Sequence, residues 1–462
     1  MQVKSEKNCS KTGHTYLQWL LAILVNTTLL TFGLQFGWIS ATTKVLQSND
    51  SPTGPLTDTE ISWVASTLSL SAAFGGPLYS VVADKLGRKI AVLAIIIPQT
   101  ICWVIKILAT NVATLIVGRA FAGLAAGGCF NVIPIYIKEI SQDDNIGLLG
   151  SLFIMFQNIG IFLIYAIGPY LDYRTVILIA LPVPVVTMAV MLKAPETPAF
   201  LVKVKRYEEA IATIALLRRL DINDKPVQNE FQCLRNEDVY FKSIPNVSLK
   251  TIWMHKPWRR GALLMTVMLN ITAFNGCTSI ITYASSIMVS SGVTLNPELQ
   301  TLSFPVIMVL AAFVSMACIE RFGRKTLSSI GLIGVAICLI SLAIIIHLQC
   351  HGIFPPGWLT VACIILALAF YAAGICPVPY IMMSEMFNFQ IRAKIIAMIV
   401  SISWCVSFVQ LIIFAPITNA VGIHYVFYIF SVLNLFSVVF IIIFLPETKG
   451  KSVEEIELEL SK

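Results

Sequence analysis

The chain has 462 residues, of which 57% are hydrophobic and only 12% carry a charge. Soluble proteins carry about 25% charged residues, so this composition predicts a polytopic membrane protein. The net charge of +7 fits basic loops on one side of a membrane and does not call for a nucleic-acid partner. The sequence has no nucleotide loop, no nucleophile elbow and too few ligands around His347, Cys350 and His351 for a metal, so we expect no enzyme and no cofactor.

Apolar runs of membrane-spanning length recur along the chain. They predict an all-α membrane protein with twelve transmembrane helices in two six-helix halves. The expected spans are 17–41, 62–83, 90–109, 112–137, 147–170, 175–193, 259–290, 299–319, 326–347, 358–384, 394–420 and 424–445. The predicted domains are an N-terminal tail (1–16), a first bundle (17–193), a linker (194–258), a second bundle (259–445) and a C-terminal tail (446–462).

A short polar loop occurs twice, once in each half. Residues 84–89 read Asp-Lys-Leu-Gly-Arg-Lys, and residues 320–325 read Glu-Arg-Phe-Gly-Arg-Lys. A charged, glycine-turned loop between two long apolar runs cannot lie in hydrocarbon, so each copy must sit at a bilayer face. Two copies about half a chain apart indicate a duplicated six-helix unit.

Basic residues predict the orientation in the membrane. One set of connections collects most of them, whereas the opposite side has only Lys44 and Arg174, with Lys106 near a span end. We therefore expect both termini, the linker and the repeated loops to be cytoplasmic, in a multi-pass protein of the plasma membrane. Asn49 then lies in an external loop within an Asn-Asp-Ser sequon, which predicts N-glycosylation there, although Pro52 just after the sequon disfavours it.

The linker is rich in charge and has a helical pattern from Tyr207 to Leu220, with acids first and bases last. One interpretation is a solvated amphipathic connection. The interpretation we favour is a cytoplasmic helical bundle that latches the two halves together.

A second motif closes each half. Pro-Glu-Thr follows the sixth span at 195–197 and the twelfth span at 446–448, where it continues into Lys-Gly-Lys. With Gly118-Arg119 and the Pro134 to Glu139 segment of the fourth span, the chain resembles the sugar-porter family of the major facilitator superfamily, nearest to insect facilitated trehalose/glucose transporters. The resemblance covers nearly the whole chain.

The resemblance implies a cytoplasmic gate of ion pairs that form in one conformation and break in the other. Its expected members are Asp84 with Arg88, Arg119, Glu139, Glu196, Glu320 with Arg324, Glu385 with Arg392, and Glu447. Plain anchoring by basic residues is the alternative, but it leaves the recurring acids unexplained. Ile146-Gly147 stands where many relatives carry Arg-Gly, so we expect Glu139 to lack its usual partner.

The resemblance also implies a central cavity in which polar groups bind sugar hydroxyls and aromatic rings stack on the sugar. The expected substrate-binding residues are Thr272, Asn275, Thr278, Tyr283, Tyr371, Tyr380, Ser403 and Trp404. Several amide side chains common in the family are replaced here, and for each aromatic residue helix packing remains the alternative. Pro377 and Pro379 remove backbone donors from the tenth span, which makes a gating hinge plausible there.

Proton coupling requires a titratable group deep in the membrane. Phe36-Gly37-Trp38 is followed by Ile39, where proton-coupled relatives carry Asp, and every acid that we can place lies at a span end. We therefore expect a monomeric carrier that moves a hexose or a disaccharide such as trehalose by facilitated diffusion and alternating access. The alternatives are a carrier of a less polar solute and a non-transporting nutrient sensor of the same fold.

Overall fold

The computed structural model describes residues 13–142, 145–243, 248–290, 300–353 and 355–461. Throughout these residues the chain forms helices joined by turns, and no strand occurs among them. The first half comprises α1 (Tyr16–Gln47), α2 (Asp58–Leu86), α3 (Arg88–Leu108), α4 (Val112–Ile140), α5 (Ile146–Ile167), α6 (Tyr173–Ala180) and α7 (Pro182–Met191). The second half comprises α12 (Lys256–Phe274), α13 (Cys277–Thr282), α14 (Ala284–Ser290), α16 (Ser303–Phe322), α17 (Arg324–Cys350), α18 (Gly357–Phe370), the π-helix η1 (Tyr371–Ile375), α19 (Val378–Met386), α20 (Phe389–Val421) and α21 (Ile423–Phe444).

The helices agree with the predicted spans, since each expected range coincides with one helix or with a broken helix. In the described part of the chain, nine helical stretches are long and apolar enough to cross a membrane. Shorter apolar segments lie in α5 and α16, and the small-residue helix α2 fills the remaining position.

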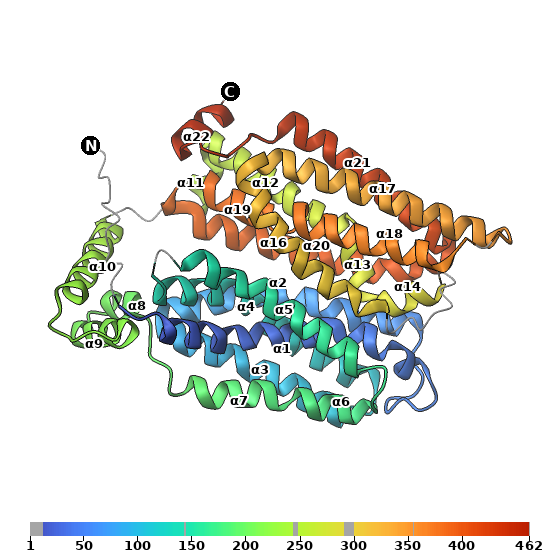
Figure 1. Ribbon diagram of the computed structural model, residues 1–462, viewed down its shortest axis with the longest axis horizontal. Helices are drawn as coiled ribbons and strands as arrows, with labels where there is room; N and C mark the ends of the chain where they lie inside the picture. Colours follow the sequence, from blue (N-terminus) through green and yellow to red (C-terminus); the bar gives the residue numbers. More distant parts are fainter. Residues whose placement is uncertain (1–12, 143–144, 244–247, 291–299, 354, 462) are drawn as a thin grey trace.

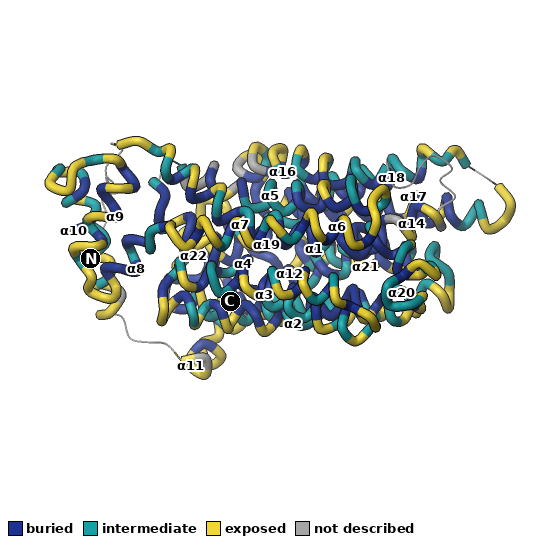
Figure 2. The backbone as a smooth tube through the Cα atoms, turned by 90° about the horizontal axis from the view of Figure 1, so that it is seen from below, coloured by how far each residue is buried: buried dark blue, intermediate teal, exposed yellow. Residues whose placement is uncertain are grey.

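The two halves lie side by side along the long axis of the molecule (Figure 1). At one end lie the linker helices α8 (Pro198–Lys203), α9 (Tyr207–Arg218) and α10 (Lys225–Ser243), together with the C-terminal helix α22 (Val453–Ser461). We call this the linker end and the opposite one the distal end. Large apolar side chains are exposed along the flanks, for example Phe436 at 68% and Leu178 at 57%, as expected of a surface that faces lipid. Figure 2 shows many exposed residues along the linker helix α10 as well.

Small residues bring α2 and α4 into close contact. A Cβ atom on Gly123 would lie 2.0 Å from the carbonyl oxygen of Leu68, and one on Gly127 would lie 2.2 Å from that of Ala72. Lipid supplies no hydrophobic drive for helix association, so such tight backbone packing is a main source of stability between membrane helices.

Three of the spanning elements are broken. Proline begins α7 after Leu181, and Gly276, with φ of +89°, separates α12 from α13. The tenth span passes from α18 through η1 and resumes as α19 just after Pro377. Proline removes a backbone donor, and π-helical turns often mark functional positions.

The linker helices form a small core of their own from Leu201, Ala210, Ile214, Val227 and Phe231, among others. The Arg218 guanidinium, which pairs with Glu230, donates to the carbonyl oxygen of Ile140 at the end of α4 (3.0 Å). Lys203 pairs with Asp84 at the end of α2 (3.2 Å). These bonds attach the linker to the first half, and latching of both halves stays a prediction.

The tail helix α22 was not predicted, and it packs on the second half. Its buried Ile456 and Leu460 face the start of α12, where Trp258 donates to Glu457 at 2.8 Å. The short helix α11 (Leu249–Met254) precedes α12 at the same end.

Candidate functional site

The repeated loops form two matching charged networks at the linker end. Gly87 and Gly323 adopt φ of +115° and +86°, a region that favours glycine. A side chain on either glycine would collide with a carboxylate, that of Glu196 at 2.3 Å or that of Glu447 at 2.7 Å. The glycines therefore allow both the positive φ of the turn and the close approach of a carboxylate.

Each of those acids caps the helix that follows the loop. Glu196 accepts hydrogen bonds from the backbone N–H groups of Arg88 (3.0 Å) and Lys89 (3.1 Å) at the start of α3. Glu447 accepts from Arg324 and Lys325 at the start of α17, both at 3.0 Å. A carboxylate at a helix N-terminus satisfies open donors and the helix dipole. The sequence indicated network acids here, but it did not show that they act as helix caps.

The arginine side chains bind a second pair of acids. Arg88 pairs with Glu139 at 3.0 Å, and Thr197 donates to the other oxygen of that carboxylate at 2.5 Å. Position 146 is isoleucine and supplies no arginine, as the sequence indicated, but Glu139 is still paired, because the loop arginine Arg88 binds it.

The second half repeats the arrangement. Arg324 binds Glu385 at 2.7 Å, and Thr448 donates to the same carboxylate at 2.5 Å. The predicted Glu385–Arg392 pair is not formed: Arg392 turns back and donates to the carbonyl oxygen of Phe387 at the end of α19 (3.0 Å). The side chain of Glu320 lies outside the described residues.

The two networks differ in electrostatics. Burial raises the pKa of Glu196, outweighing the hydrogen bonds from Thr197, Lys89 and Arg88 and the charge of Arg88 that favour its ionised form. Burial is also the largest single effect on Glu447, but four backbone N–H groups together outweigh it and lower its pKa. The native structure therefore favours ionised Glu447 more than ionised Glu196.

Each of these ion pairs joins helices of one half. Asp84 at the end of α2 lies 3.7 Å from Arg88 at the start of α3, and it also pairs with Lys203 of the linker. We expected pairs across the two sides of a gate. The observed pairs instead connect helices of the same half at the linker end.

Bonds that cross between the halves occur at the distal end. Asn419 of α20 donates to Asp58 of α2 at 2.9 Å. Closer to the middle, the Tyr165 hydroxyl of α5 donates to the carbonyl oxygen of Ile281 in α13 at 2.6 Å. The ring of Trp63 lies 6.2 Å from that of Phe408. We call these contacts the distal seal.

The predicted substrate-binding residues do not all face one space. Asn275 is buried inside the second half, where its Oδ1 accepts from the Cys277 N–H (2.7 Å) and its carbonyl oxygen accepts from Asn434 (3.1 Å). Thr272 bonds to its own helix through the Leu269 carbonyl oxygen (2.6 Å). Next to the helix break at Gly276, Asn275 is therefore bonded to α13 and α21 of its own half.

Of three other residues predicted to bind substrate, two lie where the halves meet and one is exposed. Tyr283 donates to the Leu411 carbonyl oxygen (3.2 Å), and Arg119 and Ser62 of the first half are its electrostatic neighbours. Trp404 meets Phe130 of α4 edge to face at 5.6 Å. Tyr380 keeps 42% of its surface exposed. The remaining predicted residues are half-buried, namely Thr278, Tyr371 and Ser403.

Sequence reasoning missed the aromatic partners of Trp404. The ring of Phe130 also lies 5.4 Å from Phe32 and 5.2 Å from Phe153, and Phe32 lies 5.7 Å from Phe36. These four phenylalanines and Trp404 form what we call the central aromatic cluster. Aromatic residues in apolar runs give no sequence signal that separates such a cluster from ordinary packing.

Arg119 is held by backbone alone. Its guanidinium donates to the carbonyl oxygens of Gln35 (2.5 Å), Val64 (2.9 Å) and Ala65 (3.3 Å). These bonds tie α4 to α1 and α2 and satisfy the arginine without an acid.

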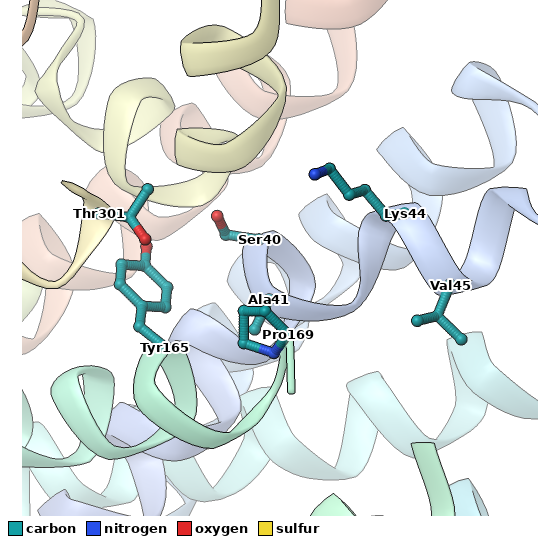
Figure 3. A pocket seen from close by; sticks show the side chains of 7 residues that line it. All are labelled: Ser40, Ala41, Lys44, Val45, Tyr165, Pro169 and Thr301. Atoms are coloured by element: carbon teal, nitrogen blue, oxygen red, sulfur yellow. The ribbon is translucent and has the colours of Figure 1, made fainter. Parts of the chain in front are cut away.

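A small pocket lies toward the distal end, away from the predicted substrate residues. Figure 3 shows it between Lys44, Ser40 and Ala41 of α1, Tyr165 and Pro169 at the end of α5, and Thr301 of the second half. It contains none of the residues predicted to bind sugar, so we do not assign the substrate to it.

Three histidine rings lie together at the distal end. His347 and His351 are close in sequence, whereas the third, His424, was not indicated by sequence spacing. The His347 ring stacks on His351 at 4.9 Å and meets His424 edge to face at 5.0 Å. Across the described ranges, no group of three or more such ligands is arranged to hold a metal ion.

Two helical halves with the same charged network at the same end define a multi-pass membrane transporter of the major facilitator type. The chain belongs to the sugar (and other) transporter family, whose model matches residues 21–460.

Curated relatives cover nearly the whole chain. The facilitated trehalose transporter Tret1 of Bombyx mori is 29% identical over 98% of this chain and 89% of its own length. Tret1 of Anopheles gambiae is 28% identical over 97% of this chain, which spans about half (56%) of that longer protein.

Solved structures match the fold. The xylose transporter XylE from E. coli, in a partially occluded inward-open conformation, superposes with a TM-score of 0.79 over 94% of this chain and 99% of XylE. An inward-open structure of XylE also gives 0.79. The sequence identity is 19% in both cases.

Proposed function

We propose that this protein is a facilitative carrier of a hexose or a disaccharide such as trehalose, working as a monomer by alternating access in the plasma membrane. The names of the curated relatives support the sugar as substrate. The observation that carries the mechanism is the asymmetry between the ends. Hydrogen bonds seal the halves together at the distal end, whereas at the linker end each charged network binds helices of its own half.

The linker end faces the cytoplasm in this proposal. The basic residues of both repeated loops gather there, as the positive-inside rule expects for a cytoplasmic face. The distal end is then external, where Asn49 lies exposed in the turn between α1 and α2. This exposure supports its assignment as a glycosylation site.

Uptake into proteoliposomes tests the sugar assignment. Labelled glucose and trehalose should each be offered to the folded, inserted protein, with equilibration of at least one expected. If neither enters vesicles in which the protein is folded and correctly inserted, the assignment is lost. Addition of a proton uncoupler should leave the plateau of uptake unchanged, because facilitated diffusion does not draw on a proton gradient.

A second candidate is a carrier of a less polar solute. The central aromatic cluster and the inward turn of Asn275 favour it, because both reduce the hydrogen-bonding groups available to a sugar. A panel that adds amphipathic glycosides to free sugars distinguishes the two candidates: preferential exchange of the glycosides would support the second.

A further inference from the structure

A lysine of the first half is fully buried against two tryptophan rings. Lys106 of α3 is 0% exposed. Its Nζ lies 3.8 Å from the ring centroid of Trp38 on α1 and 4.3 Å from that of Trp103 on α3. Tyr173 of α6 makes two contacts here. Its hydroxyl donates to the Lys106 carbonyl oxygen at 3.1 Å, and its ring packs against that of Trp38. Lys106 lies in the last turn of α3, near a span end as the sequence predicted, and the structure adds that it is buried there.

The amine has no oxygen or nitrogen acceptor among the described residues, and the Cys102 thiol beside it on α3 is only a weak acceptor. The titratable and charged groups that face it are Cys102 from α3, Arg119 from α4 and Tyr173 from α6, and α1 contributes the uncharged Trp38. This set contains no carboxylate. An ammonium group in dry surroundings needs an acceptor or a counter-charge, whereas the indole faces supply only cation–π attraction.

We propose that Lys106 is a proton-binding site that opens and closes with the distal end. The proposal rests on the alternating access of the proposed function. In the sealed form described here, α13 and α14 pack against α1, and the amine is dry and unprotonated. When the distal end opens, α13 and α14 separate from α1, and water enters the first half as far as the amine beside Trp38. The neutral amine then takes a proton from the external solution and returns it to the same solution when the seal forms again.

Transport is then sensitive to external pH without being driven by it. The distal-open form binds the extra proton, so acid favours opening and alkali favours the sealed form. The pH range in which the two forms differ in protonation ends near the pKa of a hydrated lysine, about 10.4. Because the proton returns to the side it came from, a pH gradient does not accumulate the sugar.

Two measurements on purified full-length protein test this inference. In the first, intrinsic tryptophan fluorescence is titrated from about pH 6.5 to about pH 10 without sugar, covering the window set by the lysine pKa. Protonation beside Trp38 and Trp103 should give a transition in the unmodified protein. The transition should vanish in Lys106→Met and persist in Lys44→Gln, a control that removes an exposed lysine from the same end of the molecule.

The second measurement is sugar exchange at different external pH values. Raising the pH through the window should slow exchange several-fold in the unmodified protein and in Lys44→Gln, but not in Lys106→Met. Lys106→Arg should also remove the dependence of exchange on external pH, because arginine stays charged. If Lys106→Met does not fold, Lys106→Arg tests the proton site in its place.

The outcomes separate the two proposals. An identical fluorescence titration with and without Lys106, or no transition at all, overturns the proton site. Exchange with the same pH profile in every variant overturns it too, while leaving the sugar carrier intact. If no sugar moves, the carrier assignment fails, and the fluorescence titration still decides whether Lys106 binds a proton.

Discussion

At the scale of single residues, the glutamates of the two Pro-Glu-Thr motifs have pKa values shifted in opposite directions. Glu447 has a lowered pKa, so its ionised form stabilises the native structure above its unfolded pKa, about 4.3, and that stability is lost as the pH falls. Glu196 has a raised pKa, so the native structure gains when it is protonated, and that gain is lost as the pH rises through its folded value.

Neutral isosteres should therefore act unequally. Glu447→Gln should lower the apparent melting temperature in detergent at pH 7 by a few degrees, because it removes a charge that four backbone N–H groups stabilise. Glu196→Gln should change it less, because the amide avoids the cost of a buried charge. A larger loss for Glu196→Gln than for Glu447→Gln would contradict this view of the two networks.

Residue pairing also sets the limit of what the sequence could predict. The duplicated loop predicted two charged networks, since Gly, Arg and an acid recur in each half. It could not predict that Glu385 binds Arg324 and not Arg392, because that choice depends on how α17 approaches α19. The enclosure of Lys106 likewise depends on aromatic residues from two helices, Trp38 and Trp103.

At the scale of elements, glycine contacts hold α2 against α4. Gly123→Ala should destabilise the protein by about 1–3 kcal/mol, because the new Cβ would lie 2.0 Å from a backbone oxygen and the helices must separate. Gly150→Ala in α5 is the matched control, since nothing lies within 4 Å of its Cβ, and alanine favours a helix. Thermal unfolding in detergent compares the two, and equal stability would show that this contact is not required.

The broken tenth span is a predicted hinge. Pro377→Ala restores a backbone donor and should let α18 and α19 join into a stiffer helix. We expect the maximal transport rate to fall several-fold while substrate affinity is kept. Pro416→Ala, within the continuous helix α20, should have little effect on the rate. An unchanged rate for Pro377→Ala would remove the hinge.

Element positions were the most predictable part of the fold. Apolar run length placed all the spans, because hydrocarbon requires continuous helices of that length. The fate of Asn275 was not predictable, because a helix break at Gly276 turns it into the second half. The tail helix α22 was missed because a short charged segment gives a weak signal until it packs on α12.

At the scale of the whole molecule, the distal seal selects the conformation. Asn419→Ala removes the bond to Asp58 and should favour distal opening. An exposed hydrogen bond contributes about 0.5–1 kcal/mol, so a cysteine at buried Ser62 should react with a polar thiol reagent about two to five times faster. Asp50→Ala, in the same loop region, is the control. Equal reaction rates in both variants would exclude a role for this bond in the seal.

The central claim is that the two halves carry a sugar by alternately opening toward each side. Counterflow tests it most directly: vesicles containing the protein are loaded with unlabelled trehalose or glucose and placed in a trace of the labelled sugar. A carrier whose site faces one side at a time should accumulate label transiently above equilibrium before it decays. Uptake that only approaches equilibrium, with no overshoot and no acceleration by internal sugar, would contradict the account.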